Sequence, residues 1–221
     1  MKKEILFGVP VIQTSIDPSL YDKTKIIKTI HQNYKLDPNR NEWTGGDGSH
    51  MHHSYNDWDN PKFKQPNFDK LISVYRDVFK EAINSYKLLG EVSISAAIKN
   101  YTCMKKTQSM QQHNHLTPVN KTNMNDQADF TSIHYIKFNK DIHKPTTFRN
   151  PSMYAKTLHH LKPKFKPKIN NLDFSIFSEK HFVLTTEDDM IIIPSYLEHQ
   201  VDKSYDDEMR ITVVTNLIVN D

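Results

Sequence analysis

The sequence predicts a mainly β protein with two N-terminal helices, on the basis of two patterns. In the first ninety residues, apolar side chains recur at three-and-four spacing in two stretches, which is typical of amphipathic helices. After residue 91, short runs of β-branched and aromatic residues dominate instead. Because the helices come first and the strands follow, the order favours an antiparallel sheet or sandwich with the helices packed on one side.

The length of 221 residues, with no internal repeat and no linker, predicts a single domain over residues 1–221. All-β sandwiches and barrels of this size often stay undivided. Within this domain we expect residues 1–90 to form helical and loop support, and residues 91–221 to form the β core.

The chain opens with an apolar run from Ile5 to Ile12, which predicts a strand with Pro10 at an edge or irregular position. Asp17 and Pro18 then suit the N-cap and first position of a helix that ends near Leu36. The apolar stripe of this helix consists of Leu20, Ile26, Ile27, Ile30 and Tyr34.

Residues 37–64 are polar and rich in Asn, Asp, Gly and His, so they predict a long loop with room for a short strand. A second and stronger helix is expected between Pro66 and Gly90, because glycine is favoured just beyond a helix end. Its stripe consists of Phe68, Leu71, Ile72, Tyr75, Phe79, Ile83 and Tyr86.

The remaining sequence reads as strands separated by polar turns, and its most apolar part is a closing pair of runs. The first run begins at Met190 and ends at His199, and the second begins at Arg210. We expect a site between these two strands. The other predicted strands span residues 92–104, 109–115, 130–138 and 174–183.

Composition limits the classes of protein and partner. No apolar run approaches the ~20 residues that cross a bilayer, and the N-terminal apolar region is too short for a signal peptide. The single cysteine, Cys103, cannot form an internal disulfide. We therefore expect a soluble cytoplasmic protein, in the host cytoplasm if the source is viral. A formal charge of +3 does not by itself indicate nucleic acid as a partner.

Two sets of residues have the chemistry of a metal site. His113 and His115 stand at i and i+2, which places both side chains on one face of an extended strand. His199 supplies a third imidazole, and Arg210 follows eleven residues later on the next strand. A buried arginine needs an anionic partner. The residues alone therefore predict a divalent metal site beside an anion-binding arginine.

Four motifs follow one another in the chain: His113-Asn-His115, Thr131-Ser-Ile-His-Tyr-Ile136, Ile193-Pro-Ser-Tyr-Leu-Glu-His199, and Arg210-Ile-Thr212 with Asn216. Their order resembles the signature of the Fe(II)- and 2-oxoglutarate-dependent oxygenases. The branch most similar is that of the small, prolyl-hydroxylase-related oxygenases of phages and bacteria, and the similarity covers almost the whole chain. It implies a double-stranded β-helix, a cupin-like jelly roll with the metal at its open end.

The resemblance also implies roles for single residues. His113 matches the first histidine of the family's His-x-Asp/Glu motif, and His199 matches the distal histidine. Arg210 matches the basic residue that pairs with the distal carboxylate of 2-oxoglutarate, for which a guanidinium fork is well suited. Hydroxyl groups that the resemblance places at the same carboxylate belong to Thr212, Tyr135 and, as a weaker candidate, Tyr101; Asn216 is a candidate for the wall of the site.

His115 departs from the commoner pattern, which has a carboxylate at this position. Three alternatives follow: His115 binds the metal, giving a three-His site; Asp126 or Asp129 supplies an acidic ligand and His115 lies behind it; or water takes the position. The first is the alternative we favour.

The function implied is that of an Fe(II)- and 2-oxoglutarate-dependent dioxygenase, a hydroxylase that uses O2 and converts 2-oxoglutarate to succinate and CO2. The substrate would be a small molecule or a peptide, and a homodimer is the commonest oligomer to expect. One alternative is a non-catalytic jelly-roll binding or structural module. Another is a three-His, cupin-like metalloenzyme that does not use 2-oxoglutarate.

Overall fold

The computed structural model describes residues 1–6, 9–38, 51–54, 60–85, 93–116, 128–151 and 180–220. Its helices and strands are, in chain order, β1 (Lys2–Leu6), β2 (Val9–Ser15), the 3-10 turn η1 (Pro18–Leu20), α1 (Lys23–Leu36), β3 (His52–His53), α2 (Asp69–Asn84), β4 (Ser93–Met104), β5 (Met110–His113), β6 (Phe130–Lys137), β7 (Thr146–Arg149), β8 (Lys180–Phe182), β9 (Asp189–Pro194), β10 (His199–Val201) and β11 (Arg210–Asn220).

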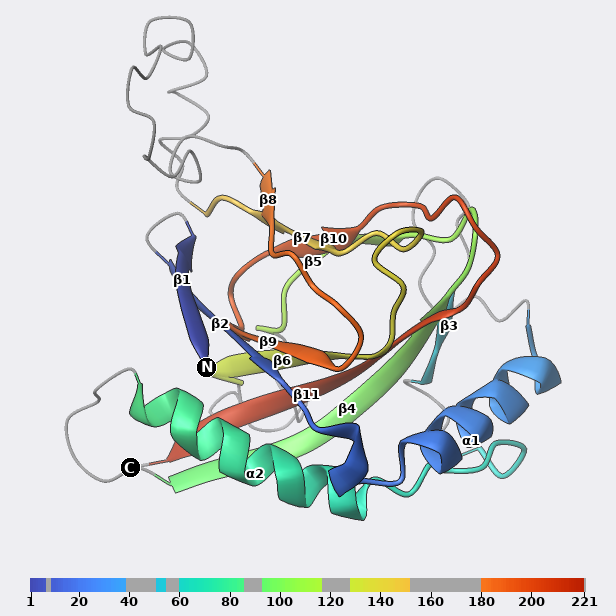
Figure 1. The fold of residues 1–221 in the computed structure, drawn as a ribbon, viewed down its shortest axis with the longest axis horizontal. Coiled ribbons are helices and arrows are strands. Elements are labelled where there is room, and N and C mark those ends of the chain that lie inside the picture. Colours follow the sequence, from blue (N-terminus) through green and yellow to red (C-terminus); the bar gives the residue numbers. More distant parts are fainter. Residues whose placement is uncertain are drawn as a thin grey trace, which may run out of the picture.

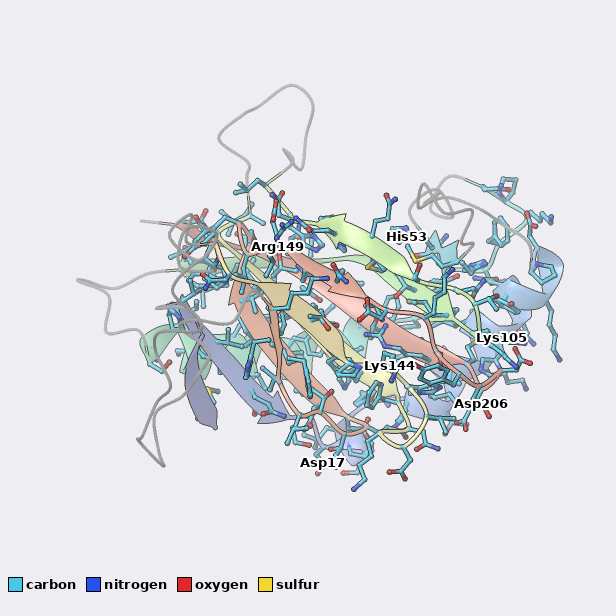
Figure 2. All side chains as sticks on the ribbon, turned by 90° about the horizontal axis from the view of Figure 1, so that it is seen from above. Asp17, His53, Lys105, Lys144, Arg149 and Asp206 are labelled. Atoms are coloured by element: carbon cyan, nitrogen blue, oxygen red, sulfur yellow. The ribbon has the colours of Figure 1, made fainter. Side chains whose placement is uncertain are left out.

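The strands form two antiparallel sheets that face each other. The major sheet has seven strands in the order β1-β2-β9-β6-β11-β4-β3, and the minor sheet has four in the order β5-β10-β7-β8. Figure 1 shows α1 and α2 on the outer side of the major sheet, with the minor sheet on its other side. This confirms the predicted class, a mainly β double-stranded β-helix with its helices packed on one sheet.

Side chains on the central strands point alternately to two buried faces of the sheet, which explains why their apolar runs are continuous. On β9, Met190 and Ile192 pack toward the helices, whereas Ile191 and Ile193 belong to the core between the two sheets. Both faces of the strand are buried, so no polar residue interrupts it. On β11, Ile211 and Val213 face outward and are apolar. The alternate residues Arg210 and Thr212 face inward and are polar, although both are buried. The inner face of β11 therefore carries polar groups that packing alone does not explain.

The helices bury most of the stripes that the sequence predicts. On α2, the stripe residues apart from Ile72 are almost inaccessible to solvent, and the helix buries them against the outer face of the major sheet. Burying one side chain of this size stabilises the fold by roughly 1.5–3 kcal/mol. The stripe residues that the structure buries are Ile26 and Ile30 on α1, and Leu71, Tyr75, Phe79 and Ile83 on α2.

Several boundaries differ from the prediction. In the run at residues 5–12, residues 5–6 belong to β1 and residues 9–12 to β2, and the two strands are paired. Asp17 caps only η1, where its side chain accepts from the Ser19 amide, and α1 begins separately at Lys23, which leaves Leu20 57% exposed. Helix α2 ends at Asn84, and the predicted positions Tyr86 and Gly90 lie outside the described residues.

The closing pair also differs from the prediction. His199 does not end the strand that begins near Met190. That strand, β9, stops at Pro194, and a turn carries the chain across to β10 in the minor sheet, where His199 is the first residue. The predicted strand at 174–183 is described only over β8, and β5 ends at His113 rather than His115. Among the described residues, no helix is both long and apolar enough to cross a membrane.

Candidate metal and co-substrate site

Three histidines converge at one end of the minor sheet. His113 on β5 and His199 on β10 are directly paired across the two strands, and His115 lies two residues beyond His113. Their ring centroids are 4.3 Å apart for His113 and His199, 5.3 Å for His113 and His115, and 5.1 Å for His115 and His199. One nitrogen from each ring can be chosen so that all three lie within 4.8 Å of one another, so this three-His cluster could hold a metal ion.

A β-bulge helps to aim His113. Between the pairs His199–His113 and Val201–Met110, β10 advances by two residues and β5 by three. The extra residue changes the alternation of β5, so that Met110 packs on Met51, Met104 and Val201 while His113 still faces His199. Bulges of this kind often redirect a side chain beside a functional site.

Backbone carbonyl groups fix the tautomers of two of the rings. Nδ1 of His113 lies 2.8 Å from the carbonyl oxygen of Gln111, and Nδ1 of His199 lies 3.0 Å from that of Leu197. Each Nδ1–H therefore donates, which leaves the Nε2 lone pair available to a metal. Nε2 of His115 lies 3.3 Å from Nε2 of His199. Two nitrogens that each bind one ion at about 2.1 Å are separated by a similar distance.

Burial also keeps the three imidazoles neutral. It is the largest cause that lowers the pKa of each ring, and it brings the pKa of His115 to about 3, with a smaller contribution from the charge on His113. The pKa of His199 is lowered well below its ordinary value, because its side chain is buried and both other rings repel its positive form. Neutral imidazole is the form that binds metal.

Of the two acidic alternatives, Asp129 is described by the structure and does not join the cluster. The carboxylate of Asp129 accepts a hydrogen bond from the amide of Val219 at 2.8 Å, and Asp129 is exposed. It is not a member of the three-His cluster. Asp126 lies outside the described residues.

Arg210, the first residue of β11, is 2% exposed on the inner face of the major sheet. Its Nη2 donates to the Thr146 hydroxyl at 3.2 Å and its Nη1 lies 4.0 Å from the sulfur of Met104, whereas its Nε has no hydrogen-bond partner among the residues that the structure describes. Within the described part of the chain, no carboxylate forms an ion pair with it. Burial lowers the pKa of the guanidinium. An uncompensated buried cation is costly, so the arrangement suits an added anion.

Tyr135 and Thr146 complete the surroundings of the guanidinium. The centroid of the Tyr135 ring lies 5.1 Å from the central carbon of Arg210. The Tyr135 hydroxyl donates to Thr146 Oγ1 at 2.7 Å and accepts from the Thr146 amide at 3.2 Å. Thr146 Oγ1 accepts from both neighbours, so its own hydrogen can be donated to a bound anion.

Sequence reasoning missed Thr146 because its strand, β7, has only four residues. The one available signal is the alternation in Thr146-Thr-Phe148-Arg, where Thr146 and Phe148 are buried and the residues between and after them are not. Four residues after a proline are too few to establish a period.

The remaining predicted residues, Thr212, Tyr101 and Asn216, differ in how they lie relative to Arg210. Thr212 lies on the same face of β11 as Arg210, but its hydroxyl shares a hydrogen bond with Thr102 at 2.7 Å. Tyr101 lies on the opposite, helix-covered face, where its hydroxyl accepts from Asn33 at 2.8 Å. The structure does not bring Tyr101 together with Arg210. Asn216, further along β11, accepts from the Thr131 hydroxyl at 3.4 Å.

Comparison with known proteins shows similarity in structure only. No family model and no curated protein matches the sequence. A prolyl hydroxylase from Trichoplax adhaerens, solved with a peptide of hypoxia inducible factor, aligns with a TM-score of 0.51 and 13% identity over 94% of this chain and 82% of that chain. A Pseudomonas putida prolyl-4-hydroxylase aligns with a TM-score of 0.50 and 10% identity over 94% and 91% of the two chains.

A third similar structure comes from a different reaction class. The non-heme alpha ketoglutarate dependent epimerase SnoN of nogalamycin biosynthesis aligns with a TM-score of 0.50 and 12% identity, over 94% of this chain and 77% of that chain. SnoN has also been solved in complex with Fe3+, alpha ketoglutarate and nogalamycin RO. The chain therefore has the double-stranded β-helix fold of the 2-oxoglutarate- and Fe(II)-dependent oxygenases.

Proposed function

We propose that this protein is an Fe(II)- and 2-oxoglutarate-dependent dioxygenase that hydroxylates its substrate. The observation that carries the proposal is Arg210, a buried cation without an anionic partner among the described residues, in the same fold as the three-His cluster. A metal site alone would not require that arginine. A site for a dicarboxylic acid requires both, because one end of the acid binds the metal and the other needs a cation.

The residues present fit both groups. His113, His115 and His199 would hold the iron through Nε2 and leave coordination positions open for the keto-acid end of 2-oxoglutarate and for O2. Arg210 would hold the distal carboxylate, with Thr146 donating a hydroxyl hydrogen and Tyr135 fixing the orientation of Thr146. Thr212 stays a candidate for the same carboxylate if its hydroxyl exchanges Thr102 for the anion.

The bound iron would supply the activation of O2, one oxygen atom passing to the substrate and the other to succinate as 2-oxoglutarate loses CO2. The chain's own contribution is position, charge and exclusion of water. Three neutral ligands leave the metal with its full double charge, which favours a doubly charged acid more than a site with one carboxylate ligand would.

Further expectations follow from the same proposal. The substrate is a small molecule or a peptide, residues 1–221 form one oxygenase domain, and a twofold homodimer is the oligomer to look for. A second candidate function has one observation in its favour. Three histidines without an acidic ligand are also what a metalloenzyme that does not use 2-oxoglutarate can have, but such an enzyme has no need for Arg210.

The test is anaerobic addition of Fe(II) and then 2-oxoglutarate to the purified protein. We expect a visible metal-to-ligand charge-transfer band that needs both additions, because only a keto acid bound to iron gives it. Succinate, which has both carboxylates but lacks the keto group, is the control and should give no band. Iron uptake without a band would favour the three-His metalloenzyme, and no iron uptake would favour a non-catalytic jelly-roll module.

A further inference from the structure

The three histidines are not held in the same way. His113 and His199 are strand residues of the minor sheet and are paired with each other. His115 belongs to no strand, and its amide donates to the carbonyl oxygen of Ser195 at 2.9 Å. Ser195 follows β9 directly, so this hydrogen bond joins the third histidine to the major sheet.

Ser195 is in turn fixed by its own side chain and backbone. Its amide donates to the carbonyl oxygen of Asp129 at 2.9 Å, and its hydroxyl lies 2.9 Å from the hydroxyl of Thr131 on β6. The Thr131 hydroxyl donates to Asn216 on β11 at 3.4 Å. A hydroxyl has one hydrogen, so Thr131 accepts from Ser195 and the order of donation is Ser195 to Thr131 to Asn216.

Burial argues against a direct role for these hydroxyls in binding substrate. Ser195 is 1% exposed and Thr131 is 0% exposed. The single hydroxyl hydrogen of each is already used within the pair and by Asn216. These side chains therefore act on the turn that holds the His115 backbone.

We propose that Thr131 and Ser195 are positioning residues for His115, through which the major sheet sets the place of the third metal ligand. The inference rests on the proposed metal site. It makes the metal centre a bridge between the two sheets, since two ligands come from the minor sheet and the third is tied to the major sheet. Thr131 and Ser195 would thus fix the position of a ligand that lies outside any strand or helix.

Two variants each remove one partner of the hydrogen bond between Thr131 and Ser195. Thr131→Val keeps the shape of the side chain and removes the hydrogen bond with Ser195, and Ser195→Ala removes the same bond while Thr131 keeps Asn216. Thr131→Ser restores a hydroxyl and should restore the wild-type properties. The matched control is Ser132→Ala on the same strand, because the buried Ser132 hydroxyl has no hydrogen-bond partner among the described residues.

The measurement is Co(II) binding followed by proton NMR of the Co(II)-loaded protein. Each imidazole that binds through one nitrogen shows one strongly shifted, exchangeable N–H resonance from the other. We expect three such resonances in the wild type and in Ser132→Ala, and two in His115→Ala. In Thr131→Val and Ser195→Ala the resonance missing from His115→Ala should move or disappear, and Co(II) affinity should fall about tenfold, as for other residues that orient a metal ligand.

The outcomes separate the inference from the proposed function. If the wild type binds Co(II) through three imidazoles and both variants keep all three resonances and full affinity, the positioning role is wrong while the metal site stands. If the wild type binds no Co(II), the metal site itself is wrong and the inference with it. Thermal unfolding of each metal-free variant shows whether the fold is retained. A general loss of packing would shift all three resonances, whereas the positioning role predicts a change in one.

Discussion

The guanidinium carbon of Arg210 lies 5.1 Å from the centroid of the Tyr135 ring, a cation-π contact in the interior between the two sheets. Thr146 receives a hydrogen bond from each of these side chains. The contact orients the guanidinium but does not neutralise it. In the proposed function this guanidinium binds a carboxylate, and the first two predictions follow from that proposal.

Arg210→Lys should weaken 2-oxoglutarate binding roughly tenfold or more and leave metal binding unchanged. A charge-assisted contact is worth about 1.5–3 kcal/mol, and ~1.4 kcal/mol corresponds to a factor of ten. Lysine keeps the charge but loses the planar fork that matches a carboxylate. Anaerobic calorimetric titration of 2-oxoglutarate into the iron-loaded proteins measures the effect. Equal affinity in the two proteins would remove Arg210 from the co-substrate site.

Thr146→Val should also weaken 2-oxoglutarate binding, by roughly two- to tenfold, since one hydrogen bond is worth about 0.5–1.5 kcal/mol. The variant removes the acceptor shared by Arg210 and Tyr135 along with a donor for the anion. The matched control is Thr147→Val, because Thr147 lies on the same strand but is not buried. The same titration applies, and an effect of equal size in the control would show that the strand, not the hydroxyl, matters.

His115→Ala should lower iron affinity steeply, whereas His115→Asp should preserve or improve it by supplying the commoner acidic ligand. Asp129→Asn should change little, because the Asp129 carboxylate already accepts from the Val219 amide and is exposed. Competition with a coloured chelator gives the three affinities. A mild His115→Ala combined with a damaging substitution at Asp129 or Asp126 would reverse the ligand assignment.

His199→Ala should abolish tight iron binding while the far-ultraviolet circular dichroism of the metal-free protein stays that of the wild type. The ring of His199 is buried at the start of a three-residue strand, and in the proposed site it serves as a ligand and not as part of an apolar cluster. Iron content after gel filtration checks the first expectation. Retention of full iron content would exclude His199 from the metal site.

The fifth prediction concerns pH and a histidine outside the metal site. His134 is buried under α2, its Nδ1 accepts from the Tyr75 hydroxyl at 2.6 Å, and burial lowers its pKa to about 3. Asp188, 3.9 Å from its other nitrogen, is itself paired with Lys23 at 2.7 Å. The nearby negative charge is therefore offset, and burial remains the dominant effect.

An unfolded histidine titrates near 6.5, so between pH 6.5 and pH 3 the unfolded chain binds a proton that folded His134 does not. Its contribution to the free energy of unfolding is complete above pH 6.5 and is lost as pH falls toward 3, by up to about 1.4 kcal/mol per pH unit. Urea unfolding of the metal-free proteins at pH 7, 6 and 5 measures this. The free energy of unfolding should fall more steeply with decreasing pH in the wild type than in His134→Gln. Parallel losses in the two proteins would mean that His134 protonates in the folded state.

Local patterns were enough to predict most of the helices and strands, whereas the double-stranded β-helix was expected from the family resemblance. The stripe on α2 and the strands β4, β6 and β11 follow from the spacing of apolar residues, because each element is long and buries a regular face. His113, His199 and Arg210 were chosen as candidate site residues from residue type and order, and the structure brings the two histidines together. The short strands β7 and β10 could not be predicted in this way, because each has too few residues to show a period.

What could not be predicted depends on contacts between distant segments. The face of β4 occupied by Tyr101 is decided by its pairing with β11 and by the helices that cover it. Similarly, the amide of His115 donates to the carbonyl oxygen of Ser195, eighty residues later in the sequence, at the point where the chain passes from the major to the minor sheet. Sequence spacing gives no information on either, because both are set by which strands become neighbours in the folded protein.

The most direct test of the whole account is a crystal structure of the protein prepared anaerobically with Fe(II) and 2-oxoglutarate, with data collected at the iron absorption edge. The account predicts one anomalous peak at about 2.1 Å from Nε2 of His113, His115 and His199. It also predicts 2-oxoglutarate bound to that iron through its keto-acid end, with its distal carboxylate on Arg210 and Thr146. An iron peak elsewhere, or a bound acid whose distal carboxylate avoids Arg210, would contradict it.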